Sequence, residues 1–327
     1  MRSPRAVVAV VAVTIVVVLV AGALLWRQHL RPGDPSGRGP SGPWFGFEVP
    51  GAEVAKVDDL ADRLGCRPAV MSRFVKLDSN LQVSDLQQMA AQGRMPLLTL
   101  EPWSWRSRPG SVEPRFSLQS IVEGRHDEDL WRIGSVIEQY GGPVMLRFAH
   151  EMNANWYPWG MGVNENTPDR YVAAWDHVHA LIERTGADVS WVWSPVAAWW
   201  PDAVPLRDLY PGDDEVDVVA ASGYGRRDLA STMSDTFAAW HHEVRRFTDK
   251  PAIIAETGAD EAVRDAYLDD LGEFFDRYPD VDGFVWFDTS PESTGATGRY
   301  EVSDTQEHLD QFRTALRNAH VACGPAD

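Results

Sequence analysis

The chain has 327 residues, of which 44% are hydrophobic and 24% are charged, a balance that excludes disordered, collagen-like and disulfide-dense proteins. Its formal net charge is −18, from 48 acidic and 30 basic residues. An acidic surface repels phosphate backbones, so we expect no nucleic acid partner.

The first segment, residues 1–26, is predicted to be a membrane anchor. Thr14 is the only clearly polar side chain between positions 6 and 25, and a helix of that length spans roughly 30 Å, the thickness of a bilayer core. Arginines flank both ends and leave the orientation open. Because residues 21–23 read Ala-Gly-Ala, a cleaved secretory signal is the alternative. In either case we expect an extracytoplasmic protein, anchored to the cell membrane or secreted.

The next segment, residues 27–43, is predicted to be a linker. Four Pro and four Gly occupy positions 31–43, a composition typical of a flexible tether. The remaining residues, 44–327, are long for one domain, which favours a large architecture such as an α/β barrel.

Eight short apolar runs follow in this domain, and amphipathic stretches separate most of them. The runs begin at Trp44, Ala69, Met95, Pro143, Val189, Val216, Pro251 and Val281. Nearly continuous apolar runs are typical of parallel strands that are buried on both faces. The helical stretches are 54–64, 129–140, 169–184, 232–247, 262–278 and 305–319. This alternation predicts a (β/α)8 TIM barrel.

The two cysteines, Cys66 and Cys323, fall at the same rim of this predicted barrel. The first precedes the second strand and the second follows the last helix, and the first and last helices are neighbours in the ring. A disulfide in an exported protein is therefore favoured, with two free buried thiols as the alternative.

Two carboxylates end predicted strands, Glu151 the fourth and Glu256 the seventh. Side chains alternate along a strand, so Arg147, Ala149 and Glu151 would share one face, as would Ala252, Ile254 and Glu256. If both faces point inward, the two carboxylates converge at the barrel mouth, and Arg147 supplies a cation. Tyr224, which ends the sixth strand, could donate a hydrogen bond.

Aromatic residues crowd the loops at the same end of the barrel. They are Trp103, Trp105, Trp156, Tyr157, Trp159, Trp199 and Trp200, with Trp286 at the end of the eighth strand. Loop tryptophans at a barrel mouth favour a sugar-stacking site over general loop packing. No metal-ligand spacing, nucleophile elbow or phosphate-binding loop occurs in the sequence, so neither a metal nor a cofactor is expected.

The segment LRFAHEMNANWYPWG, residues 146–160, resembles the HEMNGxW signature of glycoside hydrolase family 26, with Ala154 where that signature usually has Gly. IIAETG, residues 253–258, resembles the nucleophile strand of the family. The resemblance implies Glu151 as acid/base and Glu256 as nucleophile. It also implies substrate or carboxylate contacts for Arg147, His150, Trp156, Tyr224 and Trp286.

These features together predict a retaining endo-β-glycanase that acts as a monomer on a polysaccharide, with β-1,4-mannan as the default substrate on family frequency alone. Glucomannan, mixed-linkage glucan and β-1,3-xylan remain open as substrates. The alternative function is a glycan-binding barrel, with little or no turnover, in extracellular polysaccharide assembly.

Overall fold

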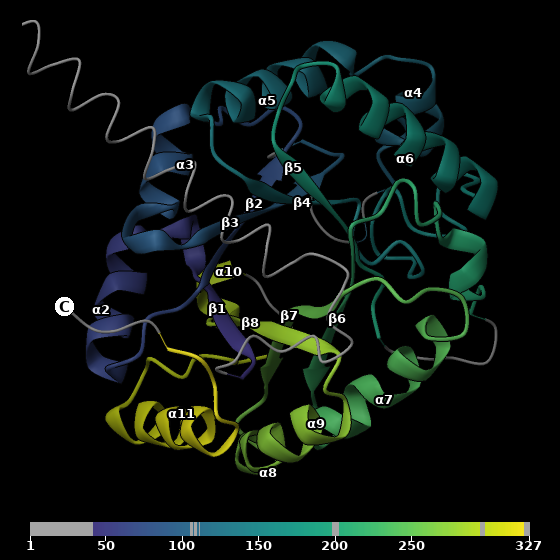
Figure 1. Ribbon diagram of the computed structural model, residues 1–327. Coiled ribbons are helices and arrows are strands. Elements are labelled where there is room, and N and C mark those ends of the chain that lie inside the picture. Colours follow the sequence, from purple (N-terminus) through teal and green to yellow (C-terminus); the bar gives the residue numbers. More distant parts are fainter. Residues whose placement is uncertain are drawn as a thin grey trace, which may run out of the picture.

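The computed structural model describes residues 42–104, 107, 110, 112–197, 203–294 and 298–323. Eight parallel strands form a closed barrel in the order of the sequence (Figure 1). The strands are β1 (Trp44–Glu48), β2 (Val70–Lys76), β3 (Met95–Glu101), β4 (Val144–Phe148), β5 (Val189–Trp193), β6 (Val218–Gly225), β7 (Ala252–Ala259) and β8 (Val281–Phe287). The prediction of a (β/α)8 barrel is therefore confirmed, and each expected apolar run contains one strand.

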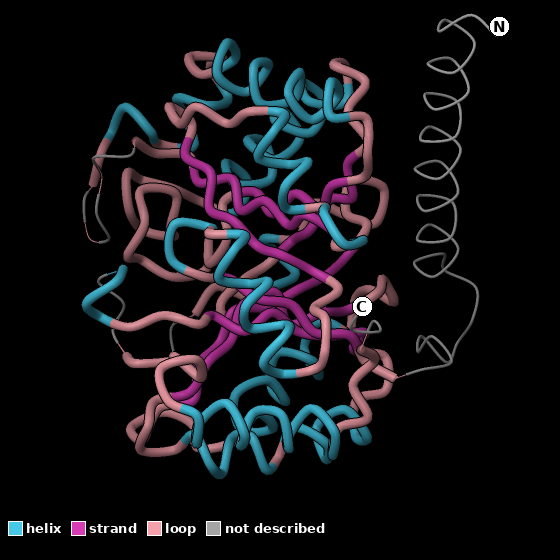
Figure 2. Tube along the Cα trace, turned by 90° about the vertical axis from the view of Figure 1, so that its left-hand side faces the viewer, coloured by secondary structure: helices cyan, strands magenta, loops and turns pink. Residues whose placement is uncertain are grey.

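Helices surround the strands on all sides (Figures 1 and 2). The described α-helices are α2 (Val54–Leu64), α3 (Val83–Met89), α4 (Leu118–Val122), α5 (Asp127–Tyr140), α6 (Pro168–Glu183), α7 (Met233–Val244), α8 (Arg264–Asp269), α9 (Leu271–Arg277), α10 (Pro291–Thr294) and α11 (Gln306–Asn318). Short 3-10 helices cover Pro50–Ala52, Ala91–Gly93, Pro114–Phe116 and Leu206–Leu209. The predicted helix 262–278 is divided into α8 and α9.

Threonine side chains start three of the long helices. Thr167, Thr232 and Thr305 each accept a hydrogen bond from the backbone N–H three residues later, at the beginning of α6, α7 and α11. Each bond satisfies a backbone donor that has no partner inside the helix, and such a cap stabilises a helix by about 1 kcal/mol.

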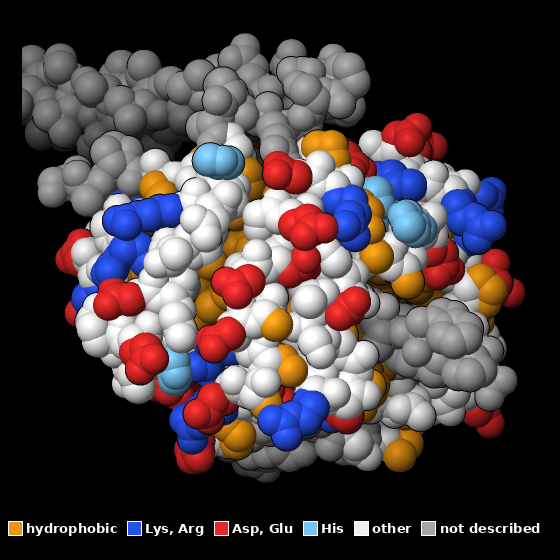
Figure 3. Space-filling model, turned by 90° about the horizontal axis from the view of Figure 1, so that it is seen from below, with side chains coloured by type: hydrophobic (Ala, Val, Ile, Leu, Met, Phe, Trp, Pro, Cys, Tyr) orange, Lys and Arg blue, Asp and Glu red, His pale blue; other side chains and the backbone are white. Residues whose placement is uncertain are grey.

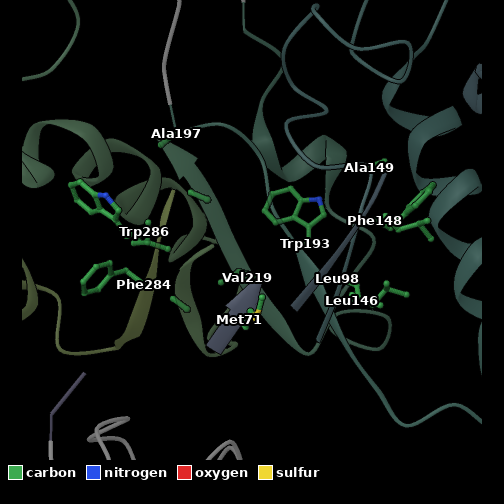
Figure 4. Packing of buried hydrophobic residues seen from close by; sticks show 14 of the residues in the cluster. Met71, Leu98, Leu146, Phe148, Ala149, Trp193, Ala197, Val219, Phe284 and Trp286 are labelled. Atoms are coloured by element: carbon green, nitrogen blue, oxygen red, sulfur yellow. The ribbon is translucent and has the colours of Figure 1, made fainter. Parts of the chain in front are cut away.

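Two layers of buried apolar side chains form the core. The inner layer contains strand residues alone and fills the barrel: Val70, Met95, Leu97, Met145, Val192, Val218, Ala220, Ile253, Ala255 and Val285. The outer layer joins the strands to the helices, and Figure 4 shows part of it, including Leu98, Leu146, Phe148, Trp193 and Trp286. Neighbouring residues of a strand thus serve different layers, which explains why the runs are apolar throughout.

Cys66 and Cys323 form a disulfide across 257 residues of sequence, as the sequence favoured. The same rim of the barrel holds two further contacts between the beginning and the end of the domain. Ala322 N–H donates to Pro43 C=O over 2.8 Å, and the Arg313 side chain donates to Leu64 C=O over 3.2 Å. The first and last described segments are therefore tied together where the strands begin.

Acidic side chains are common on the outside of the barrel. Figure 3 shows them on the face formed by helices near the end of the chain, where Asp265, Asp269, Glu307 and Asp310 line a groove between α8 and α11. Among the helices that the structure describes, none has both the length and the apolar composition to cross a bilayer. The predicted anchor, residues 1–26, and the linker up to residue 41 lie outside the described residues.

Candidate active site

Arg147 lies at the centre of the site and connects its own strand, β4, to three others, β3, β6 and β7. It is fully buried, and it follows Met145 on the inward face of β4. Its guanidinium donates to Thr99 Oγ1 over 2.8 Å, to Ser222 Oγ over 3.2 Å and to a carboxylate oxygen of Glu256 over 2.6 Å. The expected cation is thus in direct contact with the Glu256 carboxylate.

Glu256 points inward for a reason other than the expected one. Ile254, expected on the same face as Glu256, packs in the outer layer, whereas Ala255 belongs to the inner layer. The pairing with β6 then skips one residue, because Ala221 is opposite Ile254 and Ser222 is opposite Glu256. Such a β-bulge reverses the direction of the side chains that follow. The expected shared face of Ala252, Ile254 and Glu256 is therefore wrong, and the bulge turns Glu256 into the barrel.

Tyr224 reaches Glu256 from the neighbouring strand, with its hydroxyl donating to the second carboxylate oxygen. The glycines on either side of it face the helices. A Cβ on Gly223 would lie 2.6 Å from Thr236, and one on Gly225 would lie 2.5 Å from Tyr267. The pattern Gly-Tyr-Gly therefore lets α7 and α8 approach β6 while the tyrosine points inward.

Glu151 lies just beyond the end of β4, in a turn rather than on the strand. The strand ends at Phe148, and both Ala149 and Glu151 have positive φ values, 46° and 55°. Ala149 packs in the outer layer, so the expected common face of Arg147, Ala149 and Glu151 is also wrong. The turn brings Glu151 to the mouth, where the indole of Trp156 donates to its carboxylate over 2.7 Å.

The two carboxylates have different electrostatic surroundings. Burial and then the negative charge of Glu256 raise the pKa of Glu151 to about 8, against weaker opposing contributions that include the Trp156 bond and Arg147. Glu256 receives one bond from Arg147 and one from Tyr224, both of which suit an ionised carboxylate. Glu151 is therefore protonated at neutral pH, beside a carboxyl group that accepts bonds from a guanidinium and a phenol.

His150 is buried among aromatic rings next to Glu151. Its ring centroid lies 5.0 Å from that of Tyr157 and 5.6 Å from that of Phe74. Burial, and then the charge of Arg147, hold the pKa of His150 well below its ordinary value. The imidazole is therefore neutral at neutral pH and is available for hydrogen bonding.

Trp286 is not part of the mouth. Its side chain is 1% exposed, packs against Phe312 and donates to Tyr300 C=O over 2.9 Å. The next residue, Phe287, points inward instead, with its ring 6.1 Å from those of Phe74 and Tyr224. The expected substrate contact of Trp286 needs correction, because alternation along β8 turns that indole toward the helices.

The loop aromatics divide into exposed and buried ones. Trp156 is 36% exposed, whereas Trp103 and Trp159 are 3% and 0% exposed and pack edge to face. Tyr157 stacks on Trp159 with ring centroids 4.4 Å apart. These buried rings support the turn around Glu151 rather than offering a free face. Trp105, Trp199 and Trp200 lie outside the described residues.

Sequence reasoning missed Glu48, a further buried carboxylate at the mouth, and the ring of Phe74. Burial, followed by the charge of Glu256, raises the pKa of Glu48 well above its ordinary value. Burial also raises the pKa of Glu101 to about 7, against the opposing charge of Lys76. Glu48 is the last residue of β1 and Glu101 the last of β3, and this position at the end of an apolar strand is the signal that could have identified Glu48. Within the part of the chain that the structure describes, no three His, Cys, Asp or Glu side chains are grouped as metal ligands would be.

Comparisons with known proteins agree with this architecture. Residues 132–290 match the family model described as glycosyl hydrolase family 26. Endoglucanase H of Acetivibrio thermocellus is 26% identical over 239 residues, which cover 68% of this chain but only 24% of that protein. A mannan endo-1,4-beta-mannosidase of Bacillus subtilis is 23% identical over 266 residues, 72% of this chain and 70% of that protein. The solved structure of a GH26 beta-mannanase from Bacteroides ovatus shares the fold, with a TM-score of 0.69 at 19% identity over 92% of this chain and 94% of that one.

Proposed function

The chain belongs to glycoside hydrolase family 26, and from this membership we propose that it is a retaining endo-β-glycanase with Glu151 as acid/base and Glu256 as nucleophile. The observation that carries the proposal is the contrast between the two carboxylates. Glu256 is bound by Arg147 and Tyr224, whereas burial and the charge of Glu256 keep Glu151 protonated near neutral pH. A retaining glycosidase needs this pair of states.

In the first step a carboxylate oxygen of Glu256 attacks the anomeric carbon of the sugar. The bond from that carbon to the glycosidic oxygen breaks, and the oxygen takes the proton of Glu151 as the leaving sugar departs. The products of this step are a glycosyl ester on Glu256 and an ionised Glu151. Arg147 and Tyr224 keep the attacking carboxylate oriented toward the mouth.

In the second step Glu151 acts as a base. It takes a proton from a water molecule whose oxygen attacks the same carbon, and the electrons of the ester bond return to the Glu256 carboxylate. Two inversions at one carbon give net retention. The indole of Trp156, bonded to Glu151, keeps the carboxyl group in place for both proton transfers.

The proposed substrate is β-1,4-mannan. Support comes from the relatives: one is named a mannan endo-1,4-beta-mannosidase and one solved structure a beta-mannanase, while another relative is named an endoglucanase. The exposed indole of Trp156 and the partly buried ring of Phe287 would contact sugar units on either side of the cleaved bond.

We further propose that the domain acts as a monomer outside the cytoplasm, held to the membrane by residues 1–26 or secreted after their removal. The Cys66–Cys323 disulfide supports an oxidising location. Polymeric glycans are also found outside the cytoplasmic membrane, where an anchored enzyme would meet them.

The test is release of reducing ends by the detergent-solubilised full-length chain from mannan, glucomannan, mixed-linkage β-glucan, β-1,3-xylan and cellulose. We expect release from mannan, loss of at least about 10³-fold in Glu256→Ala, and no loss in Glu273→Ala, whose acid is exposed on α9. Release from another polymer alone would replace mannan as the substrate. A folded protein that binds glycan without turnover on all five would instead favour the glycan-binding function.

A further inference from the structure

We propose that Asn153 is a positioning residue that holds Glu151 at the correct place relative to Glu256. This inference rests on the acid/base role proposed above for Glu151. Proton transfer requires the Glu151 carboxyl group to be held at a fixed position, although it lies in a turn and not on a strand. In this proposal neither Asn153 nor its partner Val196 contacts the reacting groups. The side chain of Asn153 binds the backbone of Val196 and so fixes the turn that carries Glu151.

The backbone conformation of the turn that carries Glu151 is intrinsically unfavourable. Ala149 and Glu151 adopt left-handed backbone conformations, with φ of 46° and 55°, which side chains other than glycine disfavour. Such conformations persist only where surrounding contacts impose them, and they cluster at functional sites. Contacts with other parts of the chain must therefore impose the conformation of this turn.

Two contacts to the segment that follows β5 impose it. Glu151 N–H donates to Ser194 C=O over 2.8 Å. The side chain of Asn153, which is 5% exposed, bonds Val196 twice: its amide nitrogen donates to Val196 C=O, and its amide oxygen accepts from Val196 N–H, both over 2.9 Å. An amide that uses both ends on one backbone residue has a single permitted orientation.

The segment around Val196 is itself fixed to β6. Ala197 N–H donates to Ser222 C=O over 2.7 Å, and Ser222 N–H donates to Pro195 C=O over 3.0 Å. Val196 and Ser222 are therefore bridged in parallel, beyond the end of β5. β4 ends at Phe148, so its pairing with the neighbouring chain does not continue into the Glu151 turn. The side chain of Asn153 makes the bonds to that neighbouring segment instead.

This connection links the positions of the two carboxylates. Ser222 is opposite Glu256 in the pairing of β6 with β7, and its hydroxyl accepts a bond from the Arg147 that holds Glu256. Through Val196 and Ser222, Asn153 thus connects the Glu151 turn to β6 and β7, the strand pair that contains the proposed nucleophile. Without it, Glu151 would keep its side chain and lose its fixed distance from the glycosidic oxygen.

A displaced acid affects substrates unequally. Protonation by Glu151 matters most for a poor leaving group such as a sugar or phenol, and least for dinitrophenol, which departs as a stable anion. A change that only lowered the amount of folded enzyme would reduce the rates of both substrates by the same factor. The ratio of the two rates therefore separates positioning from general destabilisation.

The experiment measures kcat/KM, which reports the first chemical step, on phenyl and 2,4-dinitrophenyl β-mannobioside, or on the aryl disaccharides of whichever glycan the wild type cleaves. For Asn153→Ala we expect a loss of roughly 10²-fold on the phenyl substrate and less than about threefold on the dinitrophenyl substrate. Asn153→Asp removes the donor with almost no change of volume and should give the same pattern, since its oxygen would face Val196 C=O.

Thr248→Ala is the control. Thr248 is buried just before β7, at the rim where the strands begin, and its hydroxyl donates to an Asp213 carboxylate oxygen over 2.8 Å, far along the barrel from the Glu151 turn. It should lower the melting temperature without changing the ratio of the two rates.

Equal losses on both substrates in the Asn153 variants, or unchanged rates, would overturn the positioning role. Glu151→Ala is measured alongside, because a lack of leaving-group dependence in that variant would instead refute the proposed function.

Discussion

Glu151 and Glu256 have the same side chain, and their neighbours make them different. Glu256 receives bonds from Arg147 and Tyr224, while Glu151 is bonded to neutral groups, the indole of Trp156 and the hydroxyl of Ser222, and is buried. Burial penalises the charged form of a carboxyl group, and a nearby negative charge adds to that penalty. The proposed division of roles therefore depends on the surroundings of both carboxyl groups and not on the side chain of either residue.

The raised pKa of Glu151 predicts the alkaline side of the pH profile. The proposed first step needs a protonated Glu151, and its pKa is about 8, so kcat/KM on a phenyl substrate should fall about tenfold per pH unit above that value. The profile of Glu151→Ala should lack this fall. If the wild-type rate stays flat to pH 10 while the protein remains folded, Glu151 is not the acid.

Strand alternation governs which aromatic residue of β8 serves the core and which serves the site. Trp286 packs against Phe312 in the layer between strands and helices, whereas Phe287 lies beside Phe74 and Tyr224 at the mouth. Adjacent residues of one strand thus have different surroundings, one in the core and one at the mouth.

Substitutions at these two positions should separate stability from binding. Trp286→Ala should lower the free energy of unfolding by about 3–5 kcal/mol, because it leaves a large cavity. Phe287→Ala should leave stability nearly unchanged and weaken oligosaccharide binding by about fivefold, the effect of losing one ring contact. Urea denaturation and calorimetric titration provide the two readouts. The reverse pattern would show that Trp286 faces the sugar after all.

At the scale of the whole molecule, the barrel separates the disulfide from the chemistry. Cys66–Cys323 ties the domain together at the rim where strands begin, while Glu151 and Glu256 lie toward the ends of their strands. Closing a long loop reduces the entropy of the unfolded chain, so the bridge stabilises the fold without contacting the site.

Removal of the disulfide should therefore cost stability and spare activity. The double variant Cys66→Ser/Cys323→Ser should lose about 2–5 kcal/mol of unfolding free energy, with kcat/KM unchanged at temperatures where it stays folded. Wild type treated with reductant should melt at the same temperature as the variant. A loss of rate in the folded variant would mean that the rim influences the site.

The sequence by itself determined the barrel, the fact that Glu151 follows the fourth strand and Glu256 belongs to the seventh, and the proximity of the two cysteines. These follow from local physics: apolar runs form buried strands, and amphipathic stretches form helices. The order of elements then dictates which termini meet, because parallel strands joined by helices close in sequence order. Arg147 lies within the regular part of β4, so strand alternation gives its inward direction correctly.

Only the tertiary structure decided how each carboxylate points into the barrel. Alternation along β7 would have turned Glu256 toward the helices, and a bulge beside Ala221 reverses it. Alternation beyond Phe148 fails as well, because β4 ends there and the turn that follows is bonded to Ser194 and Val196 in the segment after β5. Bulges and left-handed turns depend on contacts with residues distant in the sequence, which override the local period of a strand.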